Sequence, residues 1–320
     1  MERVTRRWWS RVFRRAPSEP DRTPDVALRL AVLLQAGVSP FAAWRYLADA
    51  GEADAQAIAT AHVRGADLAT AIAARGERWL AIGAAWQVAT EVGAPLADGL
   101  RAVATALRDA AECRDDVRVA LAEPASTARL MSWLPLVAVL LGIALGFDTV
   151  GVLVTTPAGI GCLVAGVLLM VAARRWTGRL VRAAAPAPGV SGLTAELIAI
   201  ALTGGVSVDR ARHLADRALT PLPTSSGGPS TAAHPTVAAD DTEIDRILAL
   251  SRSAGVPAAE LLRAGAAMAR QRARTEGRTR AARLAASLLM PLGVCVLPAF
   301  IVLGVAPMLI SILSSTSVRI

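Results

Sequence analysis

The stretch Leu34-Gln35-Ala36-Gly37-Val38-Ser39-Pro40 has a second copy in the chain, Leu202-Thr203-Gly204-Gly205-Val206-Ser207-Val208. In both copies an apolar segment is followed by a glycine, and a serine comes two residues later. Glycine readily adopts the left-handed conformation that ends a helix, and serine is a favoured N-cap of the next helix. The stretch therefore predicts a tight helical hairpin that the chain uses twice.

Each copy is followed by a second glycine-centred junction, Glu91–Pro95 in the first copy and Ser253–Pro257 in the second. The two glycines are 56 residues apart in the first copy (93 − 37) and 50 in the second (255 − 205). An apolar segment containing a proline comes after each pair. We therefore expect an internal repeat in which a helical bundle precedes a membrane helix. The predicted hairpin residues are Gly37, Ser39, Pro40, Gly93, Pro95, Gly205, Ser207, Gly255 and Pro257.

The composition favours a helical membrane protein. The 320 residues are 54% hydrophobic but only 4% aromatic, and the mean hydropathy is +0.46. Such a hydropathy is high for a soluble domain, and an excess of alanine and leucine over aromatic residues favours helices over sheets. All 34 basic residues are arginine. A P-loop needs a lysine, so this chain cannot form that nucleotide site.

Three segments without charged residues are candidate membrane helices, each near the roughly 20 residues that a bilayer requires. We place them at 130–147, 150–173 and 285–312. The third segment is predicted to be one helix, kinked or tilted at one of its prolines. Arginines mark the cytoplasmic ends of the spans. These predicted topology anchors are Arg174, Arg175, Arg179, Arg182 and Arg283. The N-terminus is then cytoplasmic, the chain is multi-pass, and the C-terminus lies outside the bacterial cytoplasmic membrane.

The polar regions between the spans are predicted to be two cytoplasmic helical bundles, at 23–128 and 190–283. In the first bundle Thr23 is expected to cap a helix that ends at Gln35. Further helices are expected at 54–64, 67–74 and 78–91, and a long one from Pro95 to about Leu121. The second bundle is expected to be reduced, with a flexible linker at 220–241 in place of the middle helices. Residues 1–20 form either a basic amphipathic helix on anionic lipid or a disordered basic tail; nucleic-acid binding is not expected.

The paired hairpins, the Glu91-x-Gly93-x-Pro95-Leu96 junction and the spans resemble the type II secretion F domain, over about residues 25–313. The stretches 120–136 and 155–162 are similar to the actinobacterial branch that assembles Tad/Flp pili. The resemblance implies a non-catalytic inner-membrane platform protein that couples a cytoplasmic secretion ATPase to pilin assembly or protein export. Its implied partners are that ATPase, a second F-domain protein or another copy of itself, pilin-like subunits and membrane lipids. The acid of this junction is absent from the second copy, so only Glu91 inherits a role from it.

No residues point to an enzyme, a cofactor or a metal site. The three histidines (His62, His213 and His234) and the three cysteines (Cys113, Cys162 and Cys295) are scattered. Acidic residues such as Asp98, Asp115 and Asp116 leave a divalent-cation site open as an alternative. The density of arginine suggests a partner-binding surface for an acidic face of the ATPase. Its candidate residues are Glu91, Arg270, Arg272 and Arg274.

Two other functions remain open from the sequence. A membrane subunit of a small-solute transporter is the main alternative, although the spans contain no ionisable residue of the kind that marks a transport pathway. A receptor or sensor is the other, although almost nothing is predicted outside the membrane.

Overall fold

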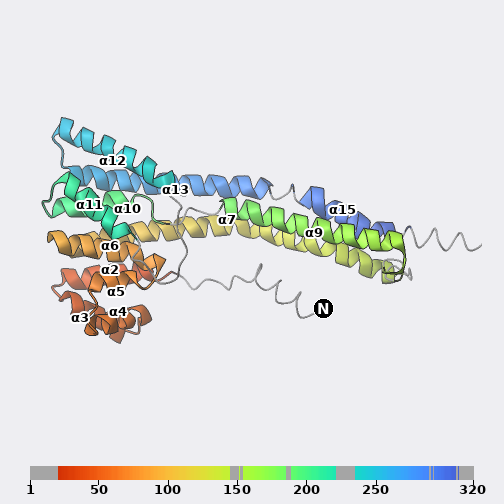
Figure 1. Ribbon diagram of the computed structural model, residues 1–320, viewed down its shortest axis with the longest axis horizontal. Helices are drawn as coiled ribbons and strands as arrows, with labels where there is room; N and C mark the ends of the chain where they lie inside the picture. The colour runs from red at the N-terminus through yellow and green to blue at the C-terminus, as the bar shows by residue number, and fades with distance from the viewer. Residues whose placement is uncertain are drawn as a thin grey trace, which may run out of the picture. The chain divides into compact units, whose positions relative to one another are not determined.

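The computed structural model describes residues 21–144, 151, 154–184, 189–220, 235–287, 290, 292–307 and 309. Every regular element in these residues is a helix, which confirms the all-α prediction (Figure 1). The N-terminal segment, the loop after the first predicted span and residues 221–234 of the predicted linker lie outside the described residues. The described residues divide into two compact units. Unit 1 contains those up to Ala111 together with Gly189–Arg272, and unit 2 contains the remainder.

The first helices of unit 1 are α2 (Thr23–Gln35), α3 (Pro40–Asp49), α4 (Ala53–Val63), α5 (Leu68–Ala73) and α6 (Glu77–Val92). The helix predicted to end at Gln35 and those predicted at 54–64, 67–74 and 78–91 agree with α2, α4, α5 and α6 within two residues. One cap was predicted wrongly. Thr23 is the first helical residue rather than the N-cap, and its backbone N–H donates to Asp21 Oδ1 at 3.2 Å. The first N–H groups of a helix have no partner within the helix. The Asp21 carboxylate provides a partner for the Thr23 N–H, as a capping side chain would.

The second part of unit 1 begins with α10 (Leu193–Thr203) and α11 (Val208–Leu219). It continues with α12 (Pro235–Ala254) and the first half of α13 (Ala258–Ser287). The prediction of a linker over 220–241 is wrong at its end, because residues 235–241 already belong to α12. Proline suits the first turn of a helix, where its missing N–H breaks no hydrogen bond, so Pro235 starts α12 rather than extending the linker.

The two helical regions, which we predicted as two bundles, share one hydrophobic core. Trp44 on α3 lies at its centre, with ring centroids 6.1 Å from Trp79 and 6.0 Å from Trp86, both on α6. The opposite side of α6 packs against α10 and α11 (Figure 1). Apolar residues occur all around α6, so this helix can bury one face against each region. The physical reason for the merger is therefore the composition of α6.

Helix α7 (Leu96–Ala144) begins in unit 1 and ends in unit 2. It was predicted to stop near Leu121, but it runs for 49 residues without a break. Pro124 falls inside it, and a proline removes one backbone hydrogen bond from a helix interior. The surrounding alanine, leucine and arginine residues are strong helix formers, which explains why the helix continues through this site.

Unit 2 also contains α9 (Pro157–Ala184) and a C-terminal helical segment. Within the described residues, Pro157–Leu180 is the one helix long and apolar enough to cross a membrane, and only 17% of its most apolar window is buried. The C-terminal segment comprises η1 (Leu292–Val296), α15 (Leu297–Phe300) and η2 (Ile301–Val305), and it packs along α9. Its described part, residues 292–307, is continuous, and two of its parts are π-helical; the single helix over 285–312 stays a prediction. The spans at 130–147 and 285–312 stay predictions.

Candidate functional site

Polar contacts join the two helical regions of unit 1, and they begin at the junction between α6 and α7. Gly93 ends α6 in the left-handed conformation, with φ +73°. Glu91, in the last turn of α6, accepts a hydrogen bond from Arg217 on α11 at 2.8 Å, and Arg210 lies 4.0 Å away. The acid predicted to bind a partner thus pairs with the second copy of the repeat.

Two glycines allow close packing at the same junction. A Cβ on Gly204 would lie 2.5 Å from Val92 Cγ2 and 2.9 Å from the Val92 carbonyl oxygen, so no side chain fits there. The neighbouring Gly205 has φ +84° and makes the turn into α11. The doubled glycine of the second hairpin therefore has two separate roles, one in packing and one in backbone conformation. Only the second role could be predicted from the sequence.

A buried ionic network lies deeper in unit 1. Only 3% of the Glu196 side chain on α10 is exposed, and the Arg270 side chain on α13 is 11% exposed. Arg270 Nε donates to Asp109 Oδ2 on α7 at 2.8 Å, while its Nη1 lies 3.6 Å from Glu196 Oε2. Arg263 Nε approaches Glu196 Oε1 to 4.0 Å. One side chain, Arg270, therefore connects three helices that come from both regions of the chain.

The network is incompletely satisfied. Glu196 Oε1 and Arg270 Nη1 are both buried, and neither has a hydrogen-bond partner among the described residues. Burial raises the pKa of Glu196, and the opposing attraction of Arg270 and Arg263 does not cancel this effect. A buried carboxylate held by long contacts retains much of its desolvation penalty. Glu196 is therefore a charge that the fold tolerates at a cost.

Unit 2 contains its own ion pairs between α7 and α13. Asp116 Oδ2 accepts hydrogen bonds from Arg274 and Arg278, both at 3.1 Å, and Arg274 also lies 3.0 Å from Glu112. The hydrogen bond from Arg274 is the main cause that lowers the pKa of Asp116. Beside these pairs, burial and then the nearby Asp116 raise the pKa of the Cys113 thiol.

These contacts change the interpretation of the predicted arginine surface. Arg270 and Arg274 are engaged in ion pairs inside their own units and do not form a free docking face. Arg272 does point outward, with 63% of its side chain exposed and Glu243 3.9 Å away. Glu196 and Asp109 were not predicted from the sequence to be site residues. One signal was available for Glu196, because it is the single charged residue in the otherwise apolar stretch Leu193–Thr203.

The remaining predicted residues are distributed as follows. Ser39 and Ser207 are both N-caps, and the Ser207 hydroxyl accepts from the Arg210 backbone N–H at 3.4 Å. Pro40 begins α3, whereas Pro95 and Pro257 immediately precede α7 and α13. The glycines at 37 and 255 have positive φ. The topology anchors lie on α9 (Arg174, Arg175, Arg179 and Arg182) and on α13 (Arg283).

The described residues contain no cluster of three or more histidine, cysteine or acidic side chains suited to a metal ion. The acids considered for a cation site pair with arginines instead: Asp98 with Arg101 and Asp115 with Arg118. His62 bonds the Ala66 carbonyl oxygen and packs against Phe41. His234 lies outside the described residues. The ion pairs of this site hold helices from the two regions together.

The helices from α2 to α7 are the part of the chain that comparison with known proteins recognises. A search of curated proteins and a search of solved structures each gave no match. The second helical region, α10 to α13, lies outside the residues matched by the family model reported next. Residues 26–144 match the family model of the type II secretion system (T2SS), protein F, which supports the resemblance to the F-domain family.

Proposed function

We propose that this protein is a non-catalytic platform subunit of the inner membrane. In this role it couples a cytoplasmic secretion ATPase to pilin assembly or protein export, in a Tad/Flp pilus or a type II secretion-like machine. The match of residues 26–144 to the type II secretion protein F family carries the proposal. The more specific assignment to the Tad/Flp branch rests on the resemblance of the stretches 120–136 and 155–162.

The exposed surface of unit 2 supports insertion in the membrane. Large apolar side chains are exposed on α7, on α9 and on the C-terminal segment. Examples are Leu140 on α7, Leu168 on α9 and Leu297 on α15, each more than half exposed. Water-exposed apolar surface of this extent is unfavourable, whereas lipid covers it without cost. This surface supports the proposal of three spans in the cytoplasmic membrane. The arginines after the second span and before the third favour a cytoplasmic N-terminus and an outside C-terminus.

Mechanical coupling fits the architecture of the chain. Helices α7 and α13 both begin in unit 1 and continue into unit 2. In this mechanism the ATPase acts on the cytoplasmic unit, and the two continuous helices carry the change toward the spans, where pilin-like subunits are moved. A second F-domain protein or another copy of this chain completes the platform.

Co-purification tests this proposal. The tagged protein is extracted from its native membrane in mild detergent, and the proteins recovered with it are identified by mass spectrometry. We expect a secretion ATPase, a second F-domain protein and small pilin-like chains. An untagged strain processed in parallel is the control. Recovery of transporter subunits instead would contradict the proposal and favour the solute-transport alternative.

A further inference from the structure

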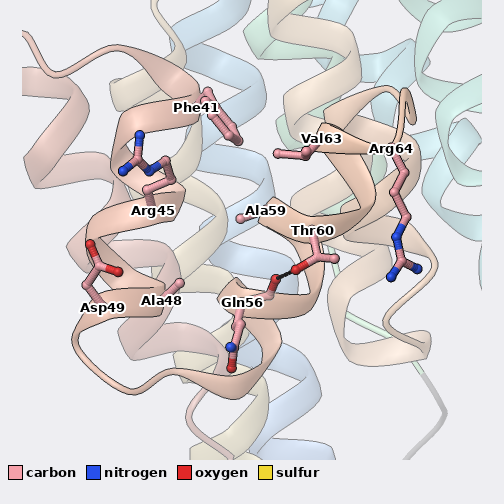
Figure 2. A pocket seen from close by; sticks show the side chains of 9 residues that line it. All are labelled: Phe41, Arg45, Ala48, Asp49, Gln56, Ala59, Thr60, Val63 and Arg64. Carbon is pink, nitrogen blue, oxygen red and sulfur yellow. Dashed lines mark hydrogen bonds between the residues drawn. The ribbon is translucent and has the colours of Figure 1, made fainter.

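Helices α3 and α4 form a groove on the surface of unit 1, with a volume of about 330 Å³ (Figure 2). Its apolar lining consists of Phe41 and Ala48 from α3 and of Ala59 and Val63 from α4. In Figure 2 the Phe41 and Val63 side chains point toward one another across the upper part of the groove. Val63, the last residue of α4, is 74% exposed. The groove therefore presents apolar surface to solvent.

The rest of unit 1 does not cover this groove. Helix α3 turns Ala43, Trp44 and Leu47 into the core, so its groove face is the opposite one. The second helical region packs on α6 rather than on α3 or α4 (Figure 1). The groove thus lies on the free outer layer of the unit, where a partner could reach it.

Arginines border the groove on both sides. Arg45 lies on the α3 side and Arg64 on the α4 side (Figure 2). Both are exposed, and within the described part of the chain neither forms an ion pair. Arg270 and Arg274, by contrast, are engaged in ion pairs within their units. The two arginines at the groove therefore offer positive charge to an acidic partner, whereas Arg270 and Arg274 do not.

We propose that the groove binds an acidic amphipathic helix of the cytoplasmic ATPase, a proposal that rests on the function proposed above. The lining residues Phe41, Arg45 and Ala48 are spaced i, i+4 and i+7, so the face extends over two helical turns, or about 10 Å. A helix of matching length can place apolar side chains between α3 and α4, as other amphipathic helices do in apolar grooves. Its carboxylates then reach Arg45 on one side and Arg64 on the other.

Asp49 gives the groove a direction. It lines the groove next to Ala48, at the C-terminal end of α3. Its carboxylate repels an acid placed beside it. The bound helix must therefore carry its acids toward Arg45 and Arg64 and a neutral or basic residue toward Asp49. Unfavourable like-charge contacts of this kind select orientation as well as partner.

Site-directed photocrosslinking tests the location. A photoreactive amino acid replaces Val63, and in a matched control it replaces Leu250 on α12, which is 54% exposed. After irradiation in native membranes, we expect a covalent adduct with the ATPase from position 63 and none from position 250. An adduct of position 63 with a second copy of this chain, or equal ATPase adducts from both positions, would overturn the proposal.

Charge reversal tests the chemistry. The double variant Arg45→Glu/Arg64→Glu should reduce the ATPase recovered per platform protein about tenfold, because two attractive contacts become repulsive. The double variant Arg246→Glu/Arg252→Glu on α12, where both arginines are exposed, is the matched control and should leave recovery unchanged. Equal membrane insertion and thermal stability of all variants would show that they fold. If the unaltered protein recovers the ATPase and the double variant does so equally, the groove inference fails while the proposed function stands. If the unaltered protein recovers no ATPase, both fail.

Discussion

Glu196 is the residue for which the structure predicts the clearest effect of pH on the stability of the fold. Its pKa is raised, so the folded protein holds this proton more tightly than the unfolded chain does. The stabilisation that follows from this difference is complete below the ordinary glutamate pKa and is lost as the pH rises through the raised value. At neutral pH the charged form therefore costs stability.

The substitution Glu196→Gln should consequently change the pH dependence of stability. Glutamine is neutral at every pH, and Arg270 keeps its hydrogen bond to Asp109. We expect the midpoint of thermal unfolding of the variant to rise relative to the unaltered protein as the pH is raised from 5 to 8. Fluorescence of the buried Trp44, Trp79 and Trp86 cluster in detergent gives the measurement. Glu260→Gln makes the same chemical change on an exposed side chain that also pairs with Arg263. Identical pH trends in the two variants would contradict the argument.

Gly204 tests whether the two helical regions depend on close packing. Gly204→Ala places a methyl group 2.5 Å from Val92 Cγ2, and overpacking of this kind costs about 1–3 kcal/mol. The midpoint of thermal unfolding should fall. Because Val92 also presents its backbone oxygen at 2.9 Å, the second change Val92→Ala should restore only part of the loss. Full additivity of the two substitutions in a double-mutant cycle would show that they do not interact.

At the scale of elements, the boundaries of α3 to α6 and of α10 and α11 could be predicted because they depend on local signals. Gly37 and Gly205 have positive φ where the hairpins turn, and the serines two residues later are N-caps. The merger of the two regions could not be predicted in this way, because the contacts of Glu91 with Arg217 and of Gly204 with Val92 link residues more than a hundred positions apart. The end of α7 was missed because helix propensity outweighed the breaking effect of one proline.

The pairing of α7 with α13 in unit 2 can be tested by a disulfide. A Cβ on Gly277 would lie 3.0 Å from Cys113 Sγ, which leaves room for a second sulfur at a bond length of about 2.05 Å. The variant Gly277→Cys, with Cys162 and Cys295 replaced by alanine, should form this bond under mild oxidation. A protease site inserted between residues 221 and 234 allows the readout, because the two fragments then stay linked only without reductant. Gly265→Cys, also on α13, is the control and should release them. Release from both variants would contradict this pairing.

At the scale of the whole molecule, unit 1 carries most of the charge contacts and unit 2 most of the exposed apolar surface. The family match covers only the first helical region and the helix that follows it. The shared core nevertheless makes the second region part of the same folded unit, because Leu197, Ile198 and Leu262 are fully buried in it. A fragment ending at Ala111 would expose the apolar surface that the second region covers. The folded unit is therefore larger than the portion that the family model matches.

The number of membrane spans is a property of the whole chain, and reporter fusions test it. Alkaline phosphatase folds to an active enzyme only outside the cytoplasm, where its disulfides form. Fusions after Asp148 and after Ser314 should be active, and fusions after Arg182 and after Thr220 should be inactive. Arginines on α9 and α13 favour the cytoplasmic side of the membrane. The apolar segment 292–307 follows α13 and is the proposed third span, which would bring the C-terminus outside. An inactive fusion after Ser314 beside an active one after Asp148 would mean that the C-terminal segment does not cross. Its packing along α9 would then be that of a helix returning to the cytoplasmic side, and the chain would have two spans instead of three.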